Sequence, residues 1–135
     1  MAETFQFDLV APERRLASGQ ALEVQLAGTE GDMTVMADHA PTLTTLRPGV
    51  LRVKTTEGTQ EYAVSGGFAD INAGGMTVLA EQAVPVGEFT REAFDAMIAE
   101  AVEERDHATP EQLDRLAKRV SDIANLGASV GLSQG

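Results

Sequence analysis

Three residues that could do covalent chemistry follow one another in the chain order of a hydrolase triad: Ser65, Asp70 and His107. Ser65 lies in the run AVSGG (63–67), which approximates the glycine-flanked serine of a nucleophile elbow. An elbow needs a helix directly after the serine, because that geometry exposes the hydroxyl, whereas residues 68–71 have the pattern of another strand. We therefore interpret the glycines as a tight turn or bulge, and we predict no catalytic residues.

The histidine and glycine patterns offer no cofactor site. His39 and His107 are the two histidines, and neither has a second histidine or a carboxylate at metal-ligand spacing. His39 stands in the turn DHAP (38–41), where we expect its ring to hydrogen-bond nearby backbone. No glycine loop leads from a strand into a helix, as phosphate-binding motifs require. The sequence thus predicts no metal and no cofactor.

Charge and composition exclude several classes of protein. The 135 residues include 21 acidic and 10 basic side chains, and the net charge of -11 would repel nucleic acid or anionic lipid. Cysteine is absent, which removes disulfides and thiol nucleophiles and fits a reducing compartment. Apolar runs are far shorter than the ~18 residues that cross a bilayer, and residues 1–5 lack the features of a signal peptide. We expect a binding or mechanical protein that meets a membrane only through another protein.

Residues 3–86 have the period-two alternation of half-buried strands. Phe5, Phe7 and Leu9 alternate with polar residues in this way, and glycine-rich turns separate the segments. Many short strands at spacings of about 8 to 12 residues predict a β-sandwich or flattened barrel. The strands expected from the alternation span residues 5–9, 22–26, 33–36, 43–46, 50–54, 62–64, 68–71 and 76–80.

After residues 85–87 the apolar period changes to that of a helix. A first helix is predicted from a cap at Thr90 to about Asp106, and a second from a capping box at Thr109 until Gly127. The short link makes them antiparallel with facing apolar stripes, and the tail over 127–135 is expected to fray. The predicted seam consists of Phe94, Met97, Ile98, Ala101, Leu113, Leu116, Val120 and Ile123.

Several stretches of the β-region, in order and spacing, resemble one known family. They are VAPERRLASG (10–19), GTEGD (28–32), DHAPTLTTLRPGVLRV (38–53), VSGGFADI (64–71) and MTVLAEQA (76–83). As a set they are similar to the epsilon subunit of the bacterial-type rotary proton-translocating ATP synthase, which corresponds to the delta subunit of mitochondrial enzymes. The matching stretches cover nearly all of the β-region, and the helical hairpin follows where the family has one.

The resemblance implies an α+β chain, with a β-sandwich of about ten strands over residues 1–87 and an antiparallel two-helix hairpin over residues 88–135. It also implies a non-catalytic rotor subunit that couples the gamma subunit to the membrane c-ring during proton-driven ATP synthesis. The location implied is peripheral, on the cytoplasmic face of the bacterial inner membrane. Carried over by motif, the contacts with the rotor ring are Glu30, Gly31, Asp32, His39, Ala40, Pro41 and Thr42.

The helical hairpin is a regulatory element in many members of the family that this sequence resembles. It folds against the sandwich, or it extends along gamma toward the catalytic alpha/beta head and blocks ATP hydrolysis. ATP-binding members carry the motif Ile/Leu-Asp-x-x-Arg-Ala, and the corresponding run here, from Phe94 and Asp95 to Ala99, has Ile98 in place of the arginine. Without that charge-assisted contact we predict no bound nucleotide. The alternative is a free-standing regulatory module whose mobile hairpin senses a ligand.

Overall fold

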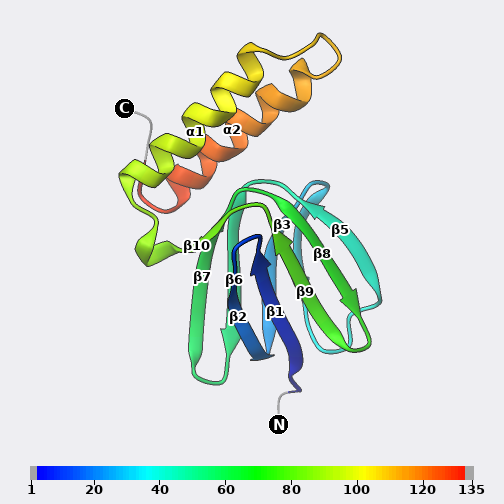
Figure 1. Ribbon diagram of the computed structural model, residues 1–135. Coiled ribbons are helices and arrows are strands. Elements are labelled where there is room, and N and C mark those ends of the chain that lie inside the picture. Colours follow the sequence, from blue (N-terminus) through cyan, green and yellow to red (C-terminus); the bar gives the residue numbers. More distant parts are fainter. Residues whose placement is uncertain (1–2, 133–135) are drawn as a thin grey trace.

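The protein forms one sheet of ten strands followed by two helices, in a computed structural model that describes residues 3–132 (Figure 1). This architecture confirms the β-sandwich of about ten strands and the two-helix hairpin expected from the sequence. The strands are β1 (Phe5–Ala11), β2 (Arg14–Ala21), β3 (Glu23–Gly28), β4 (Gly31–Val35), β5 (Thr42–Leu46), β6 (Gly49–Thr55), β7 (Gly58–Val64), β8 (Gly67–Asn72), β9 (Gly75–Ala80) and β10 (Ala83–Pro85).

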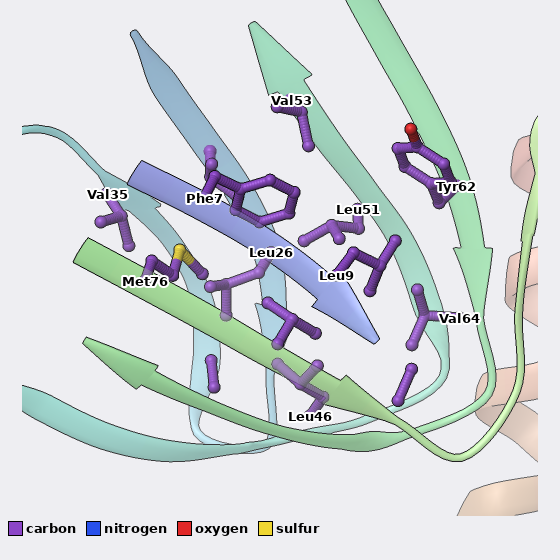
Figure 2. Close-up of a cluster of buried hydrophobic side chains, with 14 of the residues drawn as sticks. Phe7, Leu9, Leu26, Val35, Leu46, Leu51, Val53, Tyr62, Val64 and Met76 are labelled. Carbon is purple, nitrogen blue, oxygen red and sulfur yellow. The ribbon is translucent and has the colours of Figure 1, made fainter. Parts of the chain in front are cut away.

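The strands are hydrogen-bonded in the order β10-β7-β6-β3-β5-β8-β9-β1-β2, with β4 paired to β3. All of these pairs are antiparallel except β1 with β9. The sheet folds over so that its two halves face each other, and the alternating apolar residues of both halves meet between them. Figure 2 shows Phe7 and Leu9 of β1 in this core, opposite Leu51 of β6 and Tyr62 of β7.

The hairpin lies at one end of the sandwich, with its two helices side by side (Figure 1). A short 3-10 turn (Val86–Glu88) leads into α1 (Arg91–Asp106), whose bounds match the prediction. The predicted cap at Thr90 is confirmed, because its hydroxyl accepts a hydrogen bond from the backbone N–H of Ala93 at 3.1 Å. Three of the predicted seam residues on this helix, Phe94, Ile98 and Ala101, are buried, while Met97 is partly buried against them.

The second helix, α2 (Leu113–Ser129), has its N-cap at Gln112, three residues after the predicted cap at Thr109. The backbone N–H of Thr109 still donates to the side chain of Gln112 at 3.3 Å, which is half of a capping box. The segment forms a turn instead of a helical start, because the N–H of Gln112 bonds back to the carbonyl of Thr109 at 3.0 Å. Leu113 is consequently 47% exposed, so its assignment to the seam was wrong. The buried stripe starts at Leu116 and continues through Val120 and Ile123.

The prediction that Gly127 ends the second helix was also wrong. Gly127 is buried inside α2, and a Cβ at this position would overlap the ring of Phe94, so the glycine serves the packing of the two helices. The helix ends in a Schellman motif, in which Gly131 has a φ of +85° and Leu132 N–H donates to the Gly127 carbonyl at 2.7 Å. The expected fraying therefore does not include residues 127–129, which are helical, and residues 133–135 lie outside the described residues.

Candidate functional site

The serine of the elbow-like run lacks the exposure that a nucleophile elbow gives its hydroxyl. Ser65 is fully buried between β7 and β8, and its hydroxyl has no hydrogen-bond partner. His107 lies in the link between the helices, where its Nδ1 contacts the carbonyl of Glu103 at 2.9 Å. No hydrogen bond therefore joins Ser65 to His107. Among residues 3–132 no group of three or more carboxylate, histidine or cysteine side chains could hold a metal ion.

An apolar cluster joins the hairpin to the sandwich. Phe89 and Phe94 meet edge to face with their ring centroids 6.2 Å apart. Ala63 of β7 belongs to the same cluster, and Val50 and Val84 of the sandwich pack against it. The helices contribute Phe94, Ile98, Ala101, Val120, Ile123 and Leu126. The hairpin therefore shares part of its core with the sandwich.

Arg119 of α2 adds a polar contact beside this cluster. Its guanidinium donates to the carbonyl of Ser65 at 2.9 Å and forms an ion pair with Glu81 at 3.2 Å. Ser65 and Glu81 belong to two different loops of the sandwich, after β7 and after β9, so one side chain holds both. No local pattern marks this contact, because Arg119 and Ser65 are 54 residues apart.

The first predicted ring-contact segment, Glu30 to Asp32, follows β3 and begins β4. Glu30 and Gly31 are exposed in this hairpin turn. Asp32 forms an ion pair with Arg47 at 2.6 Å, and Arg47 also donates to the carbonyl of Gly28. Arg47 and Asp32 line a groove together with residues of α2, so this turn is at the end of the sandwich near the helices. The sequence did not single out Arg47 as a partner of this turn.

The second predicted segment, His39 to Thr42, lies between β4 and β5. The ring of His39 contacts the backbone as expected, with Nδ1 2.8 Å from the carbonyl of Ala40, and Thr42 donates to the same carbonyl at 3.0 Å. Thr42 begins β5 and pairs with Ile71, whereas Leu46 ends β5 beside Gly28. The two predicted segments are therefore at opposite ends of β5, roughly 15 Å apart at about 3.3 Å per residue. The structure does not bring them together.

An exposed apolar patch covers the outer face of three neighbouring strands. Leu43 of β5 is 71% exposed, Phe68 of β8 is 44% exposed and Leu79 of β9 is 40% exposed. Phe68 pairs directly with Leu79, and Leu43 is a diagonal neighbour of Phe68, two residues from its partner Thr45. Large apolar side chains that gather on the solvent side of a sheet indicate an interaction surface. We refer to Leu43, Phe68 and Leu79 as the apolar face.

Among residues 3–132, two titratable groups have clearly shifted pKa values, and neither belongs to these surfaces. A hydrogen bond from Ser18 at 2.6 Å lowers the pKa of Asp8 on β1. Burial raises the pKa of Tyr62 in the sandwich core, because a tyrosinate would lose its hydration there.

Comparison with known proteins identifies the family. Residues 4–86, which include all ten strands, match the family described as ATP synthase, Delta/Epsilon chain, beta-sandwich domain. The ATP synthase epsilon chain of Cereibacter sphaeroides (strain ATCC 17025) is 56% identical over 97% of this chain and 99% of its own length. The chain belongs to the ATP synthase epsilon chain family. The resemblance inferred from the sequence motifs is thereby confirmed.

A further epsilon chain agrees with this assignment, and two solved structures share the fold. The epsilon chain of Ruegeria sp. (strain TM1040) is 52% identical over 98% of this chain and all of its own length, so the match includes the hairpin. A chain in the mitochondrial ATP synthase of Euglena gracilis has the same fold, with a TM-score of 0.72 at 24% identity over 94% of this chain and 81% of that one. A chain from the central stalk and c-ring assembly of Tetrahymena thermophila gives a TM-score of 0.67 at 14% identity, covering 92% and 93%.

Within the epsilon chain family, the position of the motif arginine of ATP-binding members is buried here. Ile98 is 6% exposed and belongs to the apolar cluster beside Phe94, which is fully buried. Asp95 keeps the acidic residue of the motif, and it pairs with Arg91 on its own helix at 3.5 Å. Of the helices between residues 3 and 132, none is long and apolar enough to span a membrane.

Proposed function

We propose that this epsilon chain is a non-catalytic central-stalk subunit that couples the gamma subunit to the membrane c-ring during proton-driven ATP synthesis. The observation that carries the proposal is the match to epsilon chains over nearly the whole length, at up to 56% identity. A coupling part must transmit force without deforming, and a continuous hydrogen-bonded sheet folded around one core is suited to this task.

The apolar face is the surface that we assign to the gamma subunit. Phe68, Leu79 and Leu43 present large side chains to solvent on the outer face of β5, β8 and β9. Aromatic and aliphatic anchors at the centre of an interface supply most of its binding energy. The neighbouring segment from His39 to Thr42 leads directly into β5, so the proposal places it at the edge of this gamma-facing surface.

The turn from Glu30 to Asp32 is the contact that we assign to the c-ring. It lies at the opposite end of β5 from His39, so a contact at one end of the sandwich can include only one of the two segments. Glu30 is exposed and can present its carboxylate to basic groups of the ring. In this arrangement the subunit is peripheral, on the cytoplasmic face of the bacterial inner membrane, and it meets the membrane only through the ring.

The hairpin is assigned a regulatory part in the same proposal. It is docked on the sandwich through the shared apolar cluster and Arg119, and its release would free it to extend along gamma toward the catalytic head. No nucleotide is assigned to the docked state, because Ile98 fills the arginine position with a buried apolar side chain. Two states of this kind require that the docked and released forms differ by only a few kcal/mol.

A binding measurement with the purified gamma subunit tests the proposal. We expect the wild-type chain to bind gamma, and Phe68→Asp to weaken binding by about tenfold or more, because a charge would replace a central apolar anchor. Leu113→Asp is the matched control, since Leu113 is similarly exposed at 47% but lies on α2. Unchanged affinity of Phe68→Asp would remove the apolar face from the interface. Absence of wild-type binding to gamma and to a gamma–c-ring assembly would contradict the proposed function itself.

A further inference from the structure

Arg47, in the turn between β5 and β6, holds both arms of the β3–β4 hairpin. Its guanidinium donates to the carbonyl of Gly28, the last residue of β3, and to the carboxylate of Asp32 on β4 at 2.6 Å. Its backbone N–H donates to the carbonyl of Ala27 at 3.0 Å. One residue thus makes three contacts around a turn of two residues, Thr29 and Glu30.

The base of this turn is closely packed. The N–H of Thr29 donates to the carbonyl of Thr45 at 3.0 Å, and the hydroxyls of the two threonines are 2.7 Å apart. A Cβ at Gly28 would lie 2.7 Å from the carbonyl oxygen of Gly31, so only glycine lets the two arms come this close. Beyond this base Glu30 is exposed, and Gly31 has a φ of +141° with no atom within 4 Å of the position that its Cβ would take. The orientation of the tip therefore depends on its polar contacts.

The ion pair between Arg47 and Asp32 is poorly placed to stabilise the fold. The side chain of Asp32 is 80% exposed and that of Arg47 is 28% exposed. Exposed ion pairs contribute little to the free energy of unfolding, because water already solvates both charges. The planar fork of a guanidinium, in contrast, fixes the direction of two acceptors at once. The geometry is thus better suited to orienting the turn than to stabilising the chain.

On the basis of the proposed function, we infer that Arg47 is a positioning residue for the c-ring contact. Arg47 fixes the turn so that the carboxylate of Glu30 faces the basic groups of the ring. Asp32 acts as the anchor of Arg47 and not as a contact of its own, since its charge is already paired. Glu30 has no ion pair among residues 3–132, so the turn presents one uncompensated negative charge.

The test uses the complete ATP synthase in inverted membrane vesicles and measures ATP-driven proton pumping per ATP hydrolysed. We expect Arg47→Gln and Asp32→Asn each to lower this ratio by about two- to fivefold, the effect of losing one partly exposed charged contact. The double variant should be no worse than either single variant, because the two residues act as a unit. Arg47→Lys keeps the positive charge but lacks the planar fork that reaches the Gly28 carbonyl and the Asp32 carboxylate together, so its ratio should lie between those of wild type and Arg47→Gln.

Arg52→Gln is the matched control. Arg52 lines the same groove as Arg47 and forms a comparable ion pair with Glu61 at 2.7 Å between β6 and β7, but its guanidinium donates to Glu61 and not to the turn. Its replacement should leave the pumping ratio unchanged, and the melting temperatures of the full chain should agree between Arg47→Gln and Arg52→Gln. A lower melting temperature for Arg47→Gln, matching its loss of pumping, would indicate a structural role and overturn the inference.

Other outcomes separate this inference from the proposed function. If the double variant pumps clearly less than Arg47→Gln, Asp32 contacts the partner directly and the positioning role is wrong. If the single variants pump normally while Glu30→Gln does not, the turn needs no help from Arg47 and the inference is again overturned. If vesicles that lack the subunit entirely keep the full pumping ratio, the proposed function fails, whatever the Arg47 variants do.

Discussion

The strands and the helices of this protein bury their apolar residues in different ways. In the sandwich, neighbouring strands are hydrogen-bonded to one another, and the interior is filled by the strands' own side chains, such as Leu9, Val24 and Val78. The hairpin has a smaller cluster, to which the sandwich contributes Ala63 and the connecting turn contributes Phe89. We infer that the sandwich can remain folded when the hairpin leaves, whereas the helices depend on the sandwich for part of their core. The following predictions test this asymmetry.

The largest effect is expected from Leu9→Ala. Leu9 is fully buried in β1, so the free energy of unfolding should fall by about 2 to 5 kcal/mol. Hydrogen exchange should accelerate in the strands and in both helices, because the helices dock on the damaged sandwich. Leu79→Ala, at a 40% exposed position on β9, should change stability by only about 0.5 kcal/mol. If the helices kept their protection from hydrogen exchange in Leu9→Ala, the stability of the hairpin would not depend on the sandwich.

Gly127→Ala should destabilise the hairpin and leave the sandwich unaffected. The added methyl group would overlap the ring of Phe94, and overpacking of this kind costs about 1 to 3 kcal/mol. We expect faster hydrogen exchange in α1 and α2 with unchanged protection of the strands. Gly87→Ala is the control, because no atom lies within 4 Å of the position that its Cβ would take. If Gly127→Ala exchanges like wild type, the ring moves aside freely and the contact does not hold the helices.

Arg119→Gln should loosen the hairpin by a smaller amount. It removes the contacts to the Ser65 carbonyl and to Glu81, of which the second is largely exposed, so we expect about 1 kcal/mol. The measurement is the opening free energy of α2 amides by hydrogen exchange. Lys118→Gln, next to it on the helix, removes an ion pair to Asp122 within α2 and should have less effect. Equal effects of both substitutions would mean that Arg119 does not tie the hairpin to the sandwich.

Most of the elements could be predicted from the sequence because their signals are local. Alternation located the strands that face the core on one side, and the apolar stripe with its cap at Thr90 located α1. β2 was missed because its sequence, RRLASGQA, does not alternate, and it pairs with β1 at the edge of the sheet, where most of its side chains are exposed. β10 was missed because it has only three residues and ends at Pro85.

The sequence could not predict features that depend on distant residues. Gly127 has the type of a helix stop, but the ring of Phe94, more than thirty positions earlier, makes it an interior packing residue, and Gly131 ends the helix. The candidate contact segments were assigned by motif, and motif order does not reveal that they lie at opposite ends of β5. Arg47 and Arg119 bind residues 15 and 54 positions away, respectively, so no local pattern marks them.

The smallest predicted effect concerns alkaline pH and distinguishes the two regions by their chemistry. Tyr62 is the single tyrosine, it lies in the sandwich, and burial raises its pKa above the ordinary value of 10.0. Above about pH 10 the unfolded chain loses this proton while the folded chain retains it, so the free energy of unfolding falls as pH rises. Below that pH both states are protonated and Tyr62 contributes no pH dependence.

Tyr62→Phe should remove this component of the pH dependence. The variant also loses the hydrogen bond from the tyrosine hydroxyl to Gln60 at 2.7 Å, so it should be less stable than wild type near neutral pH. The free energy of unfolding should be measured with denaturant between about pH 9 and pH 11. The difference between wild type and variant should narrow as pH rises, because ionisation of Tyr62 stabilises the unfolded state of wild type only. If the free energies of unfolding of the two proteins changed in parallel with pH, Tyr62 would have the same pKa in the folded and unfolded states and would not be desolvated by the sandwich core. The hairpin has no tyrosine, so the free energy of local opening of its helices, measured by hydrogen exchange, should be the same in the two proteins. Only helical amides that exchange through global unfolding of the sandwich should differ.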